Sequence, residues 1–160
     1  MRTNKIYDVS EINGGSYHHF GVSSGIQYLL LRASPDSFSV ADTLVLQINI
    51  DGLPLFKSSN TQFWPILGRL VDPFRTEPFI IGLYVGYTKA GDVNTFLQHF
   101  VAEIQHLEEN LLYFVETSQF FKVVISAIIC DTPAKAVYTF LYIKRASVVS
   151  DFISFASHHF

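Results

Sequence analysis

The sequence predicts an α/β protein with a mixed sheet, and three patterned segments support this prediction. Residues 44–51 alternate between apolar and polar side chains, which is typical of a strand with one buried face. Residues 92–111 carry apolar side chains at helical spacing, which predicts a long amphipathic helix. Residues 120–131 form an apolar, β-branched run, which predicts a buried strand. Strands on both sides of a long helix favour helices layered on a sheet.

The strand at 44–51 ends in a carboxylate. Its apolar face consists of Leu44, Leu46, Ile48 and Ile50. Asp51 is its last residue. Gly52 and Pro54 follow, and because proline cannot donate to a ladder, regular pairing should stop there. The charge-free run FIIGLYVGY at 79–87 predicts another central strand, and residues 63–70 are a weaker candidate before it.

The helix is expected to begin after Asp92, a good N-cap residue, and to run for about six turns. Its apolar face contains Val93, Phe96, Leu97, Phe100, Val101, Ile104, Leu107 and Leu111. Thr132-Pro133-Ala134, directly after the strand at 120–131, predicts the start of a further helix.

Composition limits the class of protein. The chain has 160 residues, enough for one domain, and a charged share of 16%, well below the roughly 25% of an average soluble domain. Disorder is therefore not expected. The longest charge-free stretch is broken by glycine, histidine and serine, so no membrane span is expected. Without an apolar leader after Met1, we expect an intracellular protein. A single cysteine, Cys130, permits no internal disulfide.

Asp51 and Asp131 each end a strand that should be buried. If they meet, their charges repel unless a cation neutralises both, and Mg²⁺ prefers such oxygen ligands. The other interpretation is that each aspartate only begins its own turn or helix, since Asp-Gly and Asp-Thr-Pro are common turn and cap sequences. The spacing alone leaves both open.

Three ordered blocks carry a family resemblance. They are INIDGLPLFKSSNTQFWPI at 48–66, PFIIGLYVGYTKAGDVNTFLQHFVAEIQ at 78–105 and AIICDTPAKA at 127–136. Together they resemble the catalytic core of a DDE/D transposase, most similar to the CACTA (tnp2-like) group, and SYHHFGVSSGIQYLL at 16–30 resembles its lead-in. The resemblance implies a ribonuclease H-like fold. It divides the chain into an irregular lead-in (1–42), a partial core (43–136) and a divergent tail (137–160).

The resemblance also implies a chemistry for two positions. Asp51 and Asp131 would hold Mg²⁺ or Mn²⁺, which would activate water or a DNA 3′-hydroxyl for attack on a phosphodiester. DNA is then the implied partner, and the nucleus the implied location. The third acid should lie on a downstream helix, but the only later acidic residue is Asp151. Because the family pattern stops near Ala136, we expect an incomplete core that does not cleave DNA and that can self-associate.

Scattered basic residues and a net charge of −3 predict weak DNA binding without sequence preference. Two other classes remain. The chain could be a non-catalytic interaction module that keeps the fold. It could also be a serine hydrolase, because Gly21-Val22-Ser23-Ser24-Gly25 matches a nucleophile elbow, with Asp131 and His158 following in hydrolase order. Only 20 residues precede the motif, which leaves little room for the hydrolase sheet.

Overall fold

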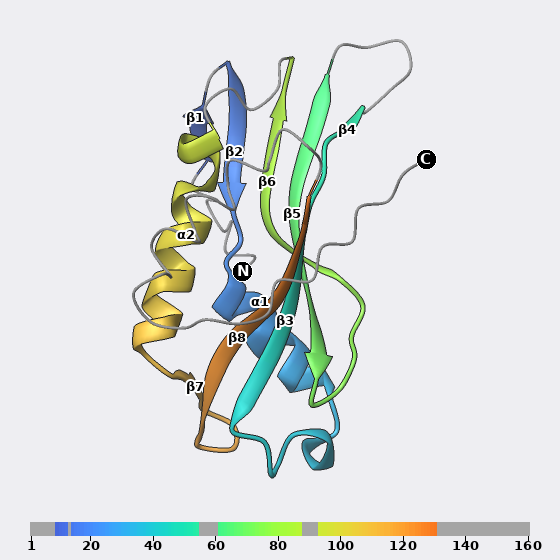
Figure 1. Cartoon of the computed structure of the whole chain (residues 1–160), viewed down its shortest axis with the longest axis vertical. Coiled ribbons are helices and arrows are strands. Elements are labelled where there is room, and N and C mark those ends of the chain that lie inside the picture. The colour runs from blue at the N-terminus through green and yellow to red at the C-terminus, as the bar shows by residue number, and fades with distance from the viewer. Residues whose placement is uncertain (1–8, 13, 55–60, 88–92, 131–160) are drawn as a thin grey trace, which may run out of the picture.

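The computed structural model describes residues 9–12, 14–54, 61–87 and 93–130. In this part of the chain, two helices and one 3₁₀ turn accompany eight strands (Figure 1). In chain order the elements are β1 (Val9–Ile12), β2 (Gly15–His19), α1 (Val22–Arg32), the 3₁₀ turn η1 (Pro35–Ser37), β3 (Thr43–Ile50), β4 (Leu53–Pro54), β5 (Gln62–Asp72), β6 (Phe79–Gly86), α2 (Val93–Glu109), β7 (Leu112–Phe114) and β8 (Gln119–Cys130).

The strands form one mixed sheet in the order β1-β2-β6-β5-β3-β8-β7, and the short β4 pairs with β5 beside it. All neighbours are antiparallel except β3 and β8, which run parallel. A parallel pair needs a long connection, and between β3 and β8 the chain passes through β4, β5, β6, α2 and β7. The sheet is strongly twisted, and α2 lies along one side of it (Figure 1). The prediction of a mixed α/β fold is confirmed.

The core lies between the sheet and the apolar sides of the two helices. In β3 the predicted alternation is confirmed, since Leu44, Leu46, Ile48 and Ile50 are at most 1% exposed. On α2 the predicted apolar face is buried from Phe96 to Leu107. The predicted strands near 63–70, 79–87 and 120–131 are also present, as β5, β6 and β8. Burial on one face therefore explains why these segments adopt their structures.

The expectation of an irregular lead-in is wrong for its described residues. β1 and β2 extend the sheet beyond β6, and α1 packs beside it. Tyr17 of β2 is 1% exposed, and Val22, Ile26 and Leu30 form a buried stripe at i, i+4 spacing on α1. These elements were missed because glycine, serine and histidine, common in loops, make up much of residues 13–25. The boundaries at residues 42 and 136, between the lead-in, the partial core and the tail, stay a prediction.

The helix is shorter than expected. α2 ends at Glu109, and Leu111, which was placed on its apolar face, is 56% exposed. The backbone N–H and the side chain of Asn110 both donate to the carbonyl of His106, at 2.8 Å and 3.0 Å, and so close the last turn of the helix. Beyond it the alternation of LYF favours pairing with β8, where Leu112 and Phe114 are buried.

Within the described chain, neither helix has the length and apolar character needed to cross a bilayer. The helix predicted to begin at Thr132 and the tail from 137 to 160 lie outside the described residues.

Candidate functional site

Asp51 follows β3, an inner strand of the sheet. β3 pairs with β5 on one side and with β8 on the other, so its end is held from both sides. Asp51 comes directly after Ile50 and is half-buried. The backbone of Asp51 therefore starts from a strand end held on both sides, and its side chain still reaches solvent, as a ligand-binding group requires.

A β-bulge in β8 alters the pairing of the two parallel strands. Leu46 pairs with Ile125, but Gln47 pairs with Ala127, so Ser126 is the extra residue. The Ser126 hydroxyl donates a hydrogen bond to the carbonyl of Leu46 at 3.1 Å. A side-chain hydrogen bond therefore supports the bulge. Beyond it, each residue of β3 pairs with the β8 residue one position later than the earlier register would give.

The bulge determines which residues end the two strands together. Beyond it, Ile50 pairs with Cys130. A regular ladder continuing from the earlier register would have paired Ile50 with Ile129 instead. The paired residues are consequently the two that immediately precede Asp51 and Asp131 in the sequence.

The indole of Trp64 lies against the turn after Asp51. A Cβ atom added to Gly52 would come within 2.6 Å of the Trp64 ring, so the ring and the Gly52 backbone are in close contact. The Trp64 Nε1–H group donates to the Gln62 side-chain oxygen at 3.2 Å, which holds the ring in place. Glycine is required here by this close approach, and the ring restrains the segment that follows Asp51.

The other residues predicted for a metal site or a hydrolase site, Asp131, Asp151 and His158, lie outside the described residues. In the ranges that are described, no three or more His, Cys, Asp or Glu side chains gather in a way that could hold a metal ion. Asp51 is therefore the one predicted metal ligand whose surroundings can be described.

Ser23 lies in the first turn of α1, after β2 and Gly21. In a nucleophile elbow the serine itself sits at the strained apex of the turn. Here the strained residue is Gly21, with φ of 96°, and among the described non-glycine residues only Ser118 has a positive φ. Ser23 itself lies within α1, and its amide donates to the Glu103 carboxylate.

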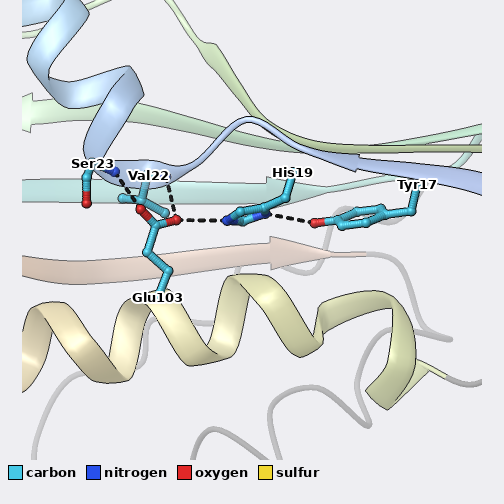
Figure 2. Close-up of polar contacts among 5 residues, drawn as sticks. All are labelled: Tyr17, His19, Val22, Ser23 and Glu103. Atoms are coloured by element: carbon cyan, nitrogen blue, oxygen red, sulfur yellow. Dashed lines mark hydrogen bonds and ion pairs between the residues drawn. The ribbon is translucent and has the colours of Figure 1, made fainter. Parts of the chain in front are cut away.

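Glu103 of α2 forms a polar cluster that the sequence did not reveal (Figure 2). Its Oε2 atom accepts hydrogen bonds from the Val22 amide at 2.7 Å and from His19 Nε2 at 2.9 Å. Its Oε1 atom accepts one from the Ser23 amide at 2.9 Å. Tyr17 completes the row, with its hydroxyl 3.0 Å from His19 Nδ1. We call Tyr17, His19 and Glu103 the Tyr-His-Glu row.

The Tyr-His-Glu row provides the cap that α1 lacks. The N-cap residue Gly21 has no side chain, so the first amides of α1 have no local acceptor. The Glu103 carboxylate, brought from α2, accepts two of them and places its negative charge at the positive end of the helix. This contact joins α1 to α2.

Burial opposes the charge on Glu103, but hydrogen bonds outweigh it. Burial by itself would raise the pKa of this carboxyl, whereas hydrogen bonds from His19, the Val22 and Ser23 amides and the Ser23 side chain lower the pKa from 4.5 to about 2. Burial first, and then the Glu103 charge, raise the pKa of Tyr17 well above its ordinary value. Tyr17 therefore keeps its proton.

These states determine how His19 is bonded. The ionised Glu103 carboxylate can only accept, so His19 donates its Nε2 proton to it, while the Tyr17 hydroxyl and Nδ1 share the other hydrogen bond of the ring. His99 stacks on His19 and on Tyr17, with ring centroids 5.8 Å and 5.9 Å apart. Both nitrogens of His19 are occupied, so the row acts as a structural clamp and offers no free base.

One feature of the sequence indicated that Glu103 of the Tyr-His-Glu row would need a partner. On an α-helix Glu103 lies two turns after Phe96 and so near the same face, an unusual place for a carboxylate. A charged residue at the border of a buried face requires a partner. The partner's identity could not be read, because Glu103 meets residues more than 80 positions earlier in the chain.

Comparison with protein-family models, curated proteins and solved structures finds no match to this chain.

Proposed function

We propose that this chain is a ribonuclease H-like core of the DDE/D transposase type, in which Asp51 and Asp131 bind a divalent metal ion. The resemblance requires the first aspartate to end the first strand of the core and the second to end its fourth strand, after the long helix. In the order of the major strands, β3, β5 and β6 precede α2, and β8 follows it. Asp51 follows β3, and Asp131 is the next residue after Cys130 of β8.

The pairing of Ile50 with Cys130 is the observation that carries this proposal. Neighbouring strands lie about 4.8 Å apart, and consecutive Cα atoms about 3.8 Å apart. In parallel strands, two residues that each directly follow a paired residue are therefore attached to backbone positions that are neighbours in the sheet. Two carboxylates brought together after such a pair would repel, and a divalent cation would relieve the repulsion by binding both.

Asp51 suits Mg²⁺ or Mn²⁺ as a ligand, because it offers hard oxygen atoms at a half-buried strand end. When bound, such an ion lowers the pKa of a coordinated oxygen nucleophile and stabilises the leaving oxygen of a phosphodiester. The contribution of this chain is to hold and orient the ion through Asp51 and Asp131. Trp64 restrains the turn after Asp51 by its contact with Gly52.

Two carboxylates suffice to bind one ion, whereas cleavage and strand transfer normally use two ions and a third acid. We therefore infer metal binding by this chain and no DNA cleavage by it alone. A non-catalytic interaction module with the same fold is the alternative, and it requires no metal.

Metal binding can be tested with Tb³⁺, an oxygen-seeking ion whose emission is sensitised by a nearby indole. Trp64 is the only tryptophan, and its ring contacts the residue after Asp51. Selective excitation of tryptophan should give Tb³⁺ emission that Mg²⁺ or Mn²⁺ displaces. Asp51→Asn and Asp131→Asn should each abolish the signal, while Asp36→Asn, at an exposed aspartate of η1, should preserve it. Unchanged emission from Asp51→Asn would reject the site and favour the interaction module.

A further inference from the structure

Both described α-helices pack against the same face of the sheet. The Phe96 ring of α2 contacts the rings of Tyr17 on β2 and Tyr84 on β6, and all three residues are buried. On α1, the backbone of Gly25 lies directly against the Phe79 ring of β6, which packs on the same core. Neither of the two described α-helices therefore covers the opposite face of the sheet.

The residues of the opposite face follow from the strand register. In β3 the buried apolar residues alternate with Val45, Gln47 and Asn49, whose side chains therefore lie on the other side. Asn49 pairs with Leu67 of β5 and with Ile129 of β8, and paired residues share a face. We call this side the open face, and its large apolar residues are Val45, Phe63, Leu67, Ile80, Leu83, Val85, Val124 and Ile129.

The open face is apolar but incompletely covered. Ile80 is 43% exposed and Ile129 is 44% exposed, and the other large apolar residues of this face are half-buried. They extend without interruption over four neighbouring strands, β6, β5, β3 and β8. A continuous apolar surface of this kind is typical of a contact surface, and parallel strands such as β3 and β8 are usually buried on both faces. The open face therefore requires a covering layer.

A segment outside the described residues has the sequence pattern of such a layer. Residues 147–160 read SVVSDFISFASHHF. Counted from Ser147, polar side chains recur at positions i, i+3, i+4, i+7, i+10 and i+11. At 100° per residue they fill an arc of about 120°. The apolar side chains lie on the other side, and they are Val148, Val149, Phe152, Ile153, Phe155, Ala156 and Phe160. This pattern predicts an amphipathic helix.

The segment is tethered within reach of the open face. It is joined to Cys130 at the end of β8 by residues 131–146, a length that spans up to roughly 50 Å when extended. Four neighbouring strands are roughly 14 Å across, and a helix of 14 residues is about 21 Å long, so one helix can cross them all. A tether also gives an effective concentration near the millimolar range, which favours this segment over a separate partner.

We propose that residues 147–160 pack as an amphipathic helix on the open face and so give the sheet its second layer. Phe152, near the centre of the apolar arc, then contacts the middle of the open face. Asp151 and His158 belong to the polar arc, so both face away from the sheet. Isolated helices of this length are marginal in water, so the helix forms together with the contact. This contact does not depend on the metal site at Asp51.

Thiol labelling of the full chain tests this cover. In a Cys130→Ala background, Asn49→Cys places a single thiol in the middle of the open face, between β5 and β8. Adding Phe152→Asp should raise its rate of reaction with a maleimide at least about tenfold, because the cover is lost. Ser154→Asp, at the centre of the polar arc, is the matched control and should leave the rate unchanged. A second thiol position, Val40→Cys, is 97% exposed and should react equally fast with either tail.

Two measurements separate loss of the cover from loss of the fold. Phe152→Leu keeps an apolar side chain and should restore slow labelling of Asn49→Cys, and circular dichroism should show the same sheet content in all variants. Equal labelling of Asn49→Cys with and without Phe152→Asp would overturn the proposal. Protection that appears only as the protein concentration rises would overturn it as well, because the cover would then be a second copy of the chain.

Discussion

Replacing Glu103 by glutamine should remove a large part of the stability of this fold at neutral pH. Glutamine keeps the size of the side chain but loses the negative charge at the N-terminus of α1. It also has one carbonyl oxygen where the carboxylate has two acceptors for the Val22 and Ser23 amides. We therefore expect the first turn of α1 and its attachment to α2 to weaken together.

The size of the loss follows from the pKa of Glu103. Hydrogen bonding lowers this pKa from 4.5 to about 2, and each unit corresponds to about 1.36 kcal/mol. The shift therefore corresponds to roughly 3 kcal/mol. The carboxylate side chain is 20% exposed, so water screens part of this interaction, and we expect a loss of about 2 kcal/mol in the free energy of unfolding.

The pH dependence has a definite sign. The pKa of Glu103 is lower in the folded chain than in the unfolded chain, so the carboxylate stabilises the fold fully above about pH 4.5. This stabilisation decreases as the pH falls toward about 2, where the folded chain also takes up the proton. The difference between the native chain and Glu103→Gln should therefore shrink over this range.

Urea unfolding at a series of pH values, followed by circular dichroism, measures these free energies. Glu109→Gln is the control, because Glu109 is an exposed glutamate at the end of the same helix. It should change the free energy of unfolding by less than about 0.5 kcal/mol. Equal stability of Glu103→Gln and the native chain at neutral pH would refute the reasoning, and so would a difference that does not change between neutral and acidic pH.

Three further predictions concern the strand end at Asp51. Gly52→Ala should lower the free energy of unfolding by about 1–3 kcal/mol and shift the emission of Trp64, because the new methyl group would meet the indole; unchanged emission would contradict the contact. Ser126→Ala should cost about 1 kcal/mol through loss of the hydrogen bond at the bulge, measured by urea unfolding, and a neutral result would mean that the hydroxyl does not support the bulge. Incubation with supercoiled plasmid and Mg²⁺ or Mn²⁺ should give no nicking, whereas nicking that disappears in Asp51→Ala would show a competent catalytic site.

The central strands and α2 could be predicted because each buries one continuous face. In β3 and α2 the apolar residues recur at the period of the element, so the pattern is visible in the sequence alone. α1 could not be predicted, because its sequence begins VSSG, a composition typical of loops. Gly25 lies within this helix because the Phe79 ring packs directly against its backbone. The contact with a distant segment thus requires glycine at position 25, whereas the local sequence around Gly25 suggests a loop.

The same distinction applies to the candidate sites. Asp51 could be proposed from the sequence, because a strand pattern ending in a carboxylate is a local signal. The bulge at Ser126 and the bonding of Glu103 depend on which segments meet, and no local pattern encodes this. The predicted end of the long helix at Leu111 was wrong for a related reason: the helix stops at Glu109, and from Leu112 the chain pairs with β8 as a strand.

The parallel pairing of β3 and β8 also has a consequence for how the molecule folds. Leu46 and Ser126, which meet at the bulge, are 80 positions apart in the chain. Contacts of such high sequence separation require closure of a long loop, and they slow folding. During synthesis β3 emerges well before β8, and it can pair with β5 but must wait for its second neighbour. A nascent chain that has produced only the first of the two aspartates therefore exposes an open edge of β3, and this edge is available to chaperones or to other chains until β8 arrives.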